Sequence, residues 1–183
     1  MTFLPAGAPN AVVRDATAAD LPVIQAIYAH HVCFGLASFE EVPPDVAELA
    51  RRRDDIVARG LPYVVVEKDK VVRAYAYAAP YRTRSGYRYA VEDSIYVAPE
   101  AVGQGLGRVA LMELIERCER LDLRQMIAVI GDSGNSASIR LHERLGFRHV
   151  GTLTAVGFKL GRWVDSVIMQ RSLGRAASCS PSS

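Results

Sequence analysis

The sequence has few cysteines, and their spacing excludes two classes of small protein. Its three cysteines, Cys33, Cys118 and Cys179, are odd in number and far apart. Such spacing fits neither a disulfide framework nor a CxxC metal site. We therefore expect Cys33 and Cys118 to be reduced residues in or near the core.

Long apolar runs are also missing. No segment approaches the roughly 18 uninterrupted apolar residues of a membrane-spanning helix. The first ten residues, MTFLPAGAPN, lack the basic region and apolar stretch of a secretory signal. The sequence thus predicts a soluble, cytoplasmic protein without a membrane partner.

Neither sign of charge dominates. Lys and Arg number 22 against 20 Asp and Glu, and no basic stripe could follow the phosphates of a nucleic acid. Nucleic acid is therefore not expected as a partner. With 183 residues, 50% of them hydrophobic, the chain suits one domain with a sizeable core. The small, polar residues 174–183 are expected to form a disordered tail.

The apolar periodicity predicts an α/β chain. Thr17 can cap a helix whose apolar positions are Leu21, Ile24, Ile27 and Tyr28, and Gly60 ends a second, charged helix. The sheet should be mixed and largely antiparallel, because a hairpin precedes the alternating strands and helices. Strands are expected over 11–15, 62–67, 71–81, 90–97, 125–131, 148–156 and 165–173, and further helices over 108–121 and 135–145.

A glycine-rich turn between a strand and a helix carries the first chemical signal. Gly103, Gly105 and Gly107 allow successive backbone N–H groups to converge, and the positive end of the following helix adds to their field. Such a turn binds a pyrophosphate, although it can also be merely tight. The Gly-Lys-Ser/Thr ending of a Walker loop is absent. A dinucleotide fold requires an acidic residue at the end of the next strand, and this strand has none.

The second signal is NSASIRLHERLGF over residues 135–147. With the glycine turn before it, the sequence resembles the GNAT acetyltransferase superfamily. The resemblance implies one domain over residues 1–173, with a mixed, largely antiparallel sheet flanked by helices and central strands that splay apart at the acetyl-CoA site. It implies transfer of an acetyl group from acetyl-CoA, as co-substrate, to an amine.

The resemblance also implies which residues bind acetyl-CoA. Backbone groups of the strand at residues 95–97 should pair with the pantetheine arm, and the turn amides should hold the pyrophosphate. Val102 stands where the superfamily has Gln or Arg, so Gln104 and Arg108 are expected to supply donors instead. The complete set is Ile95, Tyr96, Val97, Gly103, Gln104, Gly105, Leu106, Gly107, Arg108, Asn135 and Ser138.

A finer resemblance rests on VEDSIYV, RLHERLGF and VGFKLGRWVD. These segments resemble the phosphinothricin and methionine sulfoximine acetyltransferase branch, in which histidine is usual at the position of His142. The branch implies a small amino-acid-like amine as substrate. It also implies a homodimer that uses the late strands.

Glu92 is the expected catalytic base. Only a neutral amine attacks a thioester, and an α-amino group has a pKa of about 8, so a nearby carboxylate assists near neutrality. Apolar and aromatic neighbours should raise the pKa of Glu92 by desolvation. The alternative is an exposed strand carboxylate on an open face of the sheet, a description that suits Asp93 better.

His142 is the second expected catalytic residue. With an ordinary pKa of about 6.5, it could give a proton to the departing thiolate or hold a water there. The alternative is a histidine that is hydrogen-bonded on a helix face. The remaining histidines, His30, His31 and His149, have no ligand spacing with carboxylates or cysteines, so no metal site is expected.

The loop RTRSGYRY before the strand at 90–97 is expected to bind substrate. Arg82 and Arg84 can hold a carboxylate or phosphinate in a bidentate manner, while Tyr87 and Phe39 can contact the aliphatic part. Loop arginines are otherwise simply solvated. Two other functions stay open from the sequence: acetylation of a protein N-terminus or lysine, and a non-catalytic acetyl-CoA sensor.

Overall fold

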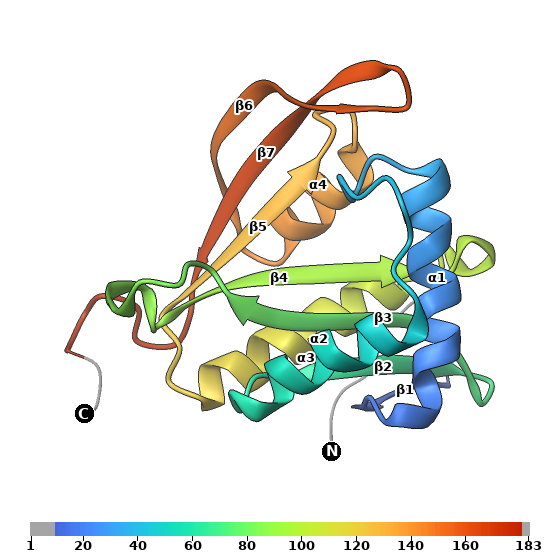
Figure 1. Cartoon of the computed structure of the whole chain (residues 1–183). Coiled ribbons are helices and arrows are strands. Elements are labelled where there is room, and N and C mark those ends of the chain that lie inside the picture. The colour runs from blue at the N-terminus through green and yellow to red at the C-terminus, as the bar shows by residue number, and fades with distance from the viewer. Residues whose placement is uncertain (1–9, 181–183) are drawn as a thin grey trace.

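The computed structural model describes residues 10–180, and these form one seven-stranded sheet with helices on both faces (Figure 1). The elements are, in chain order, β1 (Ala11–Asp15), α1 (Leu21–Phe34), α2 (Val46–Ala58), β2 (Tyr63–Lys68), β3 (Val71–Pro80), β4 (Ala90–Val97), α3 (Leu106–Arg120), β5 (Gln125–Gly131), α4 (Ser136–Arg144), β6 (Arg148–Lys159) and β7 (Arg162–Ser172), with short 3-10 helices η1 (Ala18–Asp20), η2 (Ser85–Tyr87) and η3 (Pro99–Ala101).

The sheet order β1-β2-β3-β4-β5-β7-β6 confirms the predicted mixed, largely antiparallel sheet. Only β4 and β5 pair in parallel, and their pairing stops at Asp93 opposite Ala128. Beyond that pair the two strands diverge, as Figure 1 shows. The residues of β4 from Ser94 to Val97 therefore pair with β3 alone, and their other edge is open toward β5.

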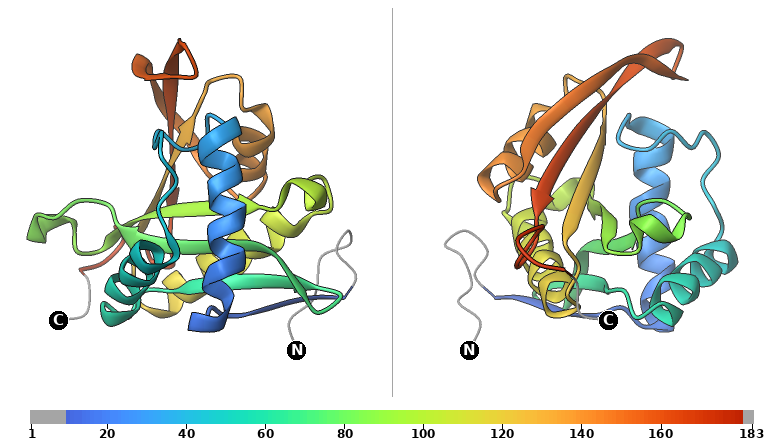
Figure 2. Two further views of the ribbon diagram at one scale, coloured as in Figure 1. Left: turned by 45° about the vertical axis from the view of Figure 1, so that its right-hand side comes forward. Right: turned by 90° about the vertical axis from the view of Figure 1, so that its left-hand side faces the viewer.

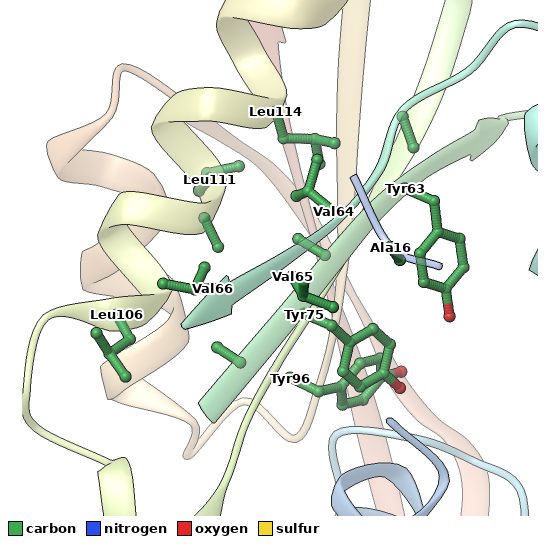
Figure 3. Close-up of a cluster of buried hydrophobic side chains, with 14 of the residues drawn as sticks. Ala16, Tyr63, Val64, Val65, Val66, Tyr75, Tyr96, Leu106, Leu111 and Leu114 are labelled. Carbon is green, nitrogen blue, oxygen red and sulfur yellow. The ribbon is translucent and has the colours of Figure 1, made fainter. Parts of the chain in front are cut away.

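The core lies on both sides of the sheet. Figure 2 shows α3 against one face and α1 with α2 against the other. Because strand side chains alternate, β2 and β3 place aliphatic residues toward α3 and tyrosines toward α1. In Figure 3, Leu111 and Leu114 of α3 lie on one side of the strands, and the stacked rings of Tyr75 and Tyr96 lie on the other.

The N-terminal turn of α1 is fixed by a network around Asp20. Its carboxylate accepts hydrogen bonds from the backbone N–H and hydroxyl of Thr17 at 2.7 and 2.8 Å. Two further bonds come from the guanidinium of Arg14, both at 2.7 Å. Thr17 thus caps η1, which leads directly into α1, and the predicted apolar stripe of α1 is buried.

The cysteines only partly follow the sequence prediction. Cys118 is buried, as expected, but Cys33 is exposed. The buried stripe of α1 runs through Ile24, Ile27, Tyr28 and Val32, and Cys33 lies outside this helical spacing. The prediction of a buried or near-core Cys33 is therefore wrong.

The C-terminal segment leaves β7 in a series of turns. Arg124 donates to the carbonyl of Ala176 at 3.3 Å and contacts the thiol of Cys179 at 3.6 Å. The expected disordered tail begins at residue 174; residues 174–180 are described in this arrangement, and 181–183 lie outside the described residues. Over residues 10–180, no helix has the length and apolarity needed to cross a membrane. The same residues contain no group of three His, Cys, Asp or Glu that could hold a metal ion.

Candidate active site

A cleft of about 530 Å³ opens where β4 and β5 diverge. Its walls are the free ends of β4 and β5, the glycine turn with the start of α3, and one side of α4. The lining includes ten of the eleven residues expected to bind the cofactor: Ile95, Tyr96, Val97, Gly103, Gly105, Leu106, Gly107, Arg108, Asn135 and Ser138.

The glycine turn has the backbone conformation that its sequence requires. Gly103 and Gly105 have φ angles of 82° and 80°, in the region that favours glycine, and Gly105 is the N-cap of α3. A side chain at Gly107 would meet Leu141 and Val97, each at 3.5 Å. Glycine therefore permits the backbone of the turn at Gly103 and Gly105, whereas a Cβ at Gly107 would be in ordinary contact with the cleft walls.

Three arginines make the cleft a site for a polyanion. Arg108, Arg140 and Arg144 all line it, and no ion pair to a described residue engages any of them. Arg140 and Arg144 are not among the site residues predicted from the sequence. Their spacing from one another on α4 was the available signal, because residues four apart share a helix face. Their charges, together with the N-terminus of α3, suit the phosphates of a CoA ester.

Gln104 is the expected cofactor residue that does not line the cleft. Its side-chain oxygen accepts a hydrogen bond from Lys68 at 2.6 Å, and its amide N–H donates to the carbonyl of Glu100 at 3.0 Å. Both contacts hold the amide on the outer side of the turn. The polar side chains that line the cleft near Val102 are therefore those of Arg108 and the α4 arginines, and Gln104 is not among them.

The start of α4 combines capping with a place in the cleft. Asn135 accepts a hydrogen bond from the backbone N–H of Ser138 at 3.2 Å, which caps the helix. Both residues line the cleft beside the open edge of β4. That edge offers backbone groups to an extended ligand in the manner of an added strand.

His31 reaches this edge from α1 and was not predicted as a site residue. Its Nε2 lies 2.9 Å from the carbonyl oxygen of Val97. Because a carbonyl only accepts, Nε2 carries the proton. Burial lowers the pKa of His31 and outweighs the opposite effect of this hydrogen bond. A neutral His31 therefore occupies the Val97 carbonyl, one of the strand groups expected to meet the pantetheine.

Asp93 overturns the expectation of an exposed strand carboxylate. It is only 6% exposed, and its Oδ2 lies 3.0 Å from Nε2 of His142, which is 4% exposed. The alternation along β4 is as expected, but β4 is a central strand whose second face is covered by α3 and α4. The face of β4 to which Asp93 points is therefore closed, and Asp93 lies inside the protein.

Glu92 precedes Asp93 and points to the opposite face of the sheet, as strand alternation requires. It pairs with Ala79 of β3 and Ile127 of β5, one position before the strands part. Burial and the negative charge of Asp93 raise the pKa of Glu92, while the positive charge of Arg82 lowers it. The net shift is upward, in the direction expected from its surroundings. Glu92 does not line the cleft itself; it stands beside it on the other face.

The loop between β3 and β4 carries the predicted substrate residues Arg82, Arg84 and Tyr87. The Arg82 guanidinium lies over the ring of Tyr81 at 4.8 Å, and the Tyr81 and Tyr87 rings meet edge to face at 5.9 Å. The loop lies at the start of β4, whereas the glycine turn follows its end (Figure 1). Glu92 is thus near the arginine loop, and the cofactor residues extend away from it.

Phe39, the fourth predicted substrate residue, lies elsewhere. It is 40% exposed, and its ring occupies the space that a side chain at Gly157 would need. The same ring approaches Gly131 at the end of β5. Because β4 and β5 are parallel, the end of β5 and the start of β4 are at opposite ends of the strand pair. Phe39 therefore lies by Gly131 at the end of β5, away from the arginine loop.

Comparison with known proteins agrees with this geometry. The model of the acetyltransferase (GNAT) family matches residues 24–147. Phosphinothricin N-acetyltransferase of Alcaligenes faecalis is 55% identical over 93% of this chain and 85% of its own length. The L-methionine sulfoximine/L-methionine sulfone acetyltransferase of Pseudomonas aeruginosa is 42% identical over 90% of this chain and 95% of its own. The crystal structure of a GNAT superfamily phosphinothricin acetyltransferase from Sinorhizobium meliloti in complex with acetyl-CoA has a TM-score of 0.92 and 48% identity, covering 94% of both chains.

Proposed function

We propose, on the premise that this chain belongs to the acetyltransferase (GNAT) family, a division of its site into a cofactor side and an amine side. The protein is an acetyl-CoA-dependent N-acetyltransferase for a small amino-acid-like amine. The observation that carries the division is the parting of β4 from β5 directly after Glu92 and Asp93. Acetyl-CoA, bound in the cleft beyond this point, supplies an acetyl thioester.

Glu92 is the proposed base on the amine side. Its carboxylate is held on the face of β4 opposite the cleft, and its raised pKa makes it a better proton acceptor than an ordinary carboxylate. The amine reacts in its neutral form, and its nitrogen gives one proton to Glu92 as it bonds to the acetyl carbon. An amine that enters from the α1 side meets Glu92 at the point where the strands separate.

Arg82 and Arg84 are proposed to bind the acidic group of the substrate. Of these two arginines, Arg82 is the one whose positive charge lowers the pKa of Glu92. Tyr87 and Phe39 are proposed as apolar contacts from the two ends of the strand pair. The relatives named for phosphinothricin and methionine sulfoximine support a substrate that carries an amine together with a carboxylate.

His142 is proposed to give a proton to the departing thiolate. The residue lines the cleft on the cofactor side and is buried against Asp93. Glu92 and His142 therefore serve opposite proton transfers from opposite faces of β4. Acceptance at Glu92 and donation at His142 leave the overall reaction balanced, because the amine loses one proton and the thiolate gains one.

A homodimer through the late strands is the proposed assembly. β6 is an edge strand of the sheet, and the hairpin with β7 exposes a run of large apolar side chains. An exposed apolar edge of this kind marks a protein interface. The exposed residues are Val150, Leu153, Val156, Phe158, Leu160 and Trp163. A cytoplasmic location is proposed on the sequence alone.

The dimer is tested by light scattering at micromolar concentration. Trp163, 66% exposed, is replaced by Arg, and the matched control places Arg at Val42, which is 79% exposed on the α1–α2 connection. The wild type and Val42→Arg should be dimers and Trp163→Arg a monomer. A monomeric wild type contradicts the assembly.

Release of free thiol from acetyl-CoA, screened over small amines and a peptide with a free N-terminus, tests the activity. Amino-acid-like amines should be the active class, and exclusive activity on the peptide contradicts the substrate proposal. Glu92→Gln should lower kcat by about 10² to 10⁴ with acetyl-CoA affinity retained. Glu116→Gln, the same change on the exposed face of α3, serves as the control.

The arginine loop is tested with amines that have or lack a carboxylate. Arg82→Ala and Arg84→Ala should raise KM more for the carboxylate-bearing amines. Arg88→Ala is the matched control, because Arg88 lies in the same loop and over a tyrosine ring at 4.7 Å. Equal effects on both amine classes contradict a role in binding the acidic group.

A further inference from the structure

Asp93 and His142 join the two parts of the protein that separate at the cleft. Asp93 is the last residue of β4 that pairs with β5, and His142 lies on α4, the helix that follows β5. Their side chains meet at 3.0 Å, both are buried, and both line the cleft. The contact therefore lies at the point where the strands part.

The hydrogen bonds of His142 determine where its protons are. Nδ1 lies 2.8 Å from the carbonyl oxygen of Ser138 and 3.4 Å from the Ser138 hydroxyl; the carbonyl is the closer partner and only accepts, so Nδ1 carries a proton. Nε2 faces the carboxylate Oδ2 of Asp93. A neutral ring with its proton on Nδ1 would set a lone pair of Nε2 against that oxygen. The pair is therefore satisfied only when a further proton lies between Nε2 and Oδ2.

No other described group compensates Asp93. Its Oδ1 is buried without a hydrogen-bond partner among residues 10–180. Two other ionisable groups interact electrostatically with Asp93, Glu92 on β4 and Cys118 on α3, and neither can carry a positive charge; burial and the charge of Asp93 raise the pKa of Cys118 to about 12. On the other side of His142 lies the ring of Phe147, edge to face at 4.9 Å. Within residues 10–180, the cleft arginines make no hydrogen bond to Asp93. The N–H of His142 is therefore the group that compensates the negative charge of Asp93.

We propose that Asp93 is a positioning residue that keeps His142 doubly protonated and so stores the proton for the departing thiolate. This inference rests on the proposed function of His142 as the proton donor. Burial alone lowers the pKa of His142, but the hydrogen bond and charge of Asp93, aided by the Ser138 carbonyl, outweigh it and raise the pKa above its ordinary value. This direction of shift favours the doubly protonated form of His142.

The proton transfer balances with the reaction. As the C–N bond forms and the C–S bond breaks, His142 gives the proton on Nε2 to the thiolate sulfur. A thiol has an ordinary pKa of about 8.5, so the departing thiolate is basic enough to compete with the imidazole of His142 for this proton. His142 is then neutral, and the lone pair of its Nε2 faces a lone pair of the Asp93 carboxylate. This repulsion favours uptake of a proton from solvent, which returns His142 to its doubly protonated form.

Asp93→Asn is the variant that separates charge from shape. The Asn amide N–H can donate to Nε2 of a neutral His142, while Nδ1–H still donates to Ser138. Both hydrogen bonds are kept, and only the extra proton is lost. If Asp93 merely holds the ring in place, this variant should behave as the wild type.

Proton NMR of the free protein measures the protonation of His142 without any turnover. The chain has four histidines, so His142 is assigned by loss of its signal in His142→Gln, and His30 and His149 serve as references. In the wild type His142 should titrate above the ordinary value of about 6.5. In Asp93→Asn it should titrate below that value. Titration of wild-type His142 at or below the ordinary value overturns the inference even if Asp93→Asn does not fold.

Kinetics then test the use of the proton. Asp93→Asn should lower kcat about 10²-fold while the KM for acetyl-CoA changes less than about twofold. The alkaline limb of its kcat profile should move to lower pH. In the His142→Gln background, Asp93→Asn should cost nothing further. An unchanged kcat with an unmoved alkaline limb, or a full additional loss in that background, overturns the proposal.

The two proposals fail in different ways. If no amine supports thiol release, the proposed function fails, whereas the NMR titration still reports whether Asp93 keeps a proton on His142. If turnover is normal but His142 titrates ordinarily, only the role of Asp93 is lost.

Discussion

Two buried aspartates of this protein, Asp20 and Asp93, have opposite surroundings. The Asp20 carboxylate accepts four hydrogen bonds, from Thr17 and Arg14, and burial is offset by a full positive charge. Asp93 is equally buried, but it has one partner, His142, and an oxygen without any in the described chain. Both sites hold a carboxylate out of water, and only the first compensates it completely.

The difference separates a stabilising site from a reactive one. The surplus of donors lowers the pKa of Asp20, chiefly through the hydrogen bonds from Arg14, so its carboxylate stays ionised and fixes the start of α1. At Asp93 the deficit keeps a proton on its partner instead. Loss of charge should therefore reduce stability at Asp20 and turnover at Asp93.

Asp20→Asn should have the largest effect on stability. The variant keeps the size of the side chain but loses the charge that Arg14 and Thr17 bind, and a hydrogen bond to a charged group contributes about 1.5–3 kcal/mol. We expect the free energy of unfolding in urea to fall by about 3 kcal/mol. Below the unfolding transition, kcat should match the wild type, and a loss of kcat without a loss of stability breaks the comparison.

The stability difference between wild type and Asp20→Asn should depend on pH. The folded pKa of Asp20 is lowered, whereas an unfolded aspartate titrates at about 3.9. The stabilisation is thus complete above the unfolded value and is lost as the pH falls through the folded one. Urea unfolding between pH 7 and pH 3 should show the difference narrowing below about pH 4, and a constant difference would exclude ionisation as its cause.

Arg14→Lys should have a smaller effect. Arg14 binds both oxygens of Asp20 and also donates to Glu67 at 2.6 Å, a geometry that an ammonium cannot reproduce. The positive charge stays, so we expect a loss of about 1 kcal/mol in urea unfolding. A loss as large as that of Asp20→Asn would mean that the fork geometry, rather than the charge, stabilises the site.

Asp93→Asn should change the free energy of unfolding least, by less than about 1 kcal/mol at pH 7, because its hydrogen bonds are kept. The folded pKa of His142 is raised, so in the wild type its contribution is complete below the unfolded value of about 6.5 and is lost as the pH rises through the folded one. Thermal unfolding from pH 5 to pH 9 should show this loss in the wild type and not in Asp93→Asn. A large destabilisation at all pH values would make Asp93 a stabilising residue like Asp20.

Local signals in the sequence were sufficient for the elements and for most of the cleft. Gly103 and Gly105 take the positive φ angles of the turn that their sequence predicted, and Asn135 caps its helix through its neighbours in the chain. The family resemblance added the acetyl-CoA cleft and the class of reaction, which the comparisons support. These features depend on residues close together in sequence, so they can be predicted from the sequence alone.

Only the tertiary structure decided which buried carboxylates have enough hydrogen-bond donors and positive charge around them and which do not. Alternation along β4 separates Glu92 from Asp93, but the burial of Asp93 depends on α3 and α4 lying over the face to which it points. The contact between Asp93 and His142 spans 49 positions of the chain, and that between His31 and Val97 spans 66. No local pattern encodes such pairs, because each is created when separate elements fold against the same strand.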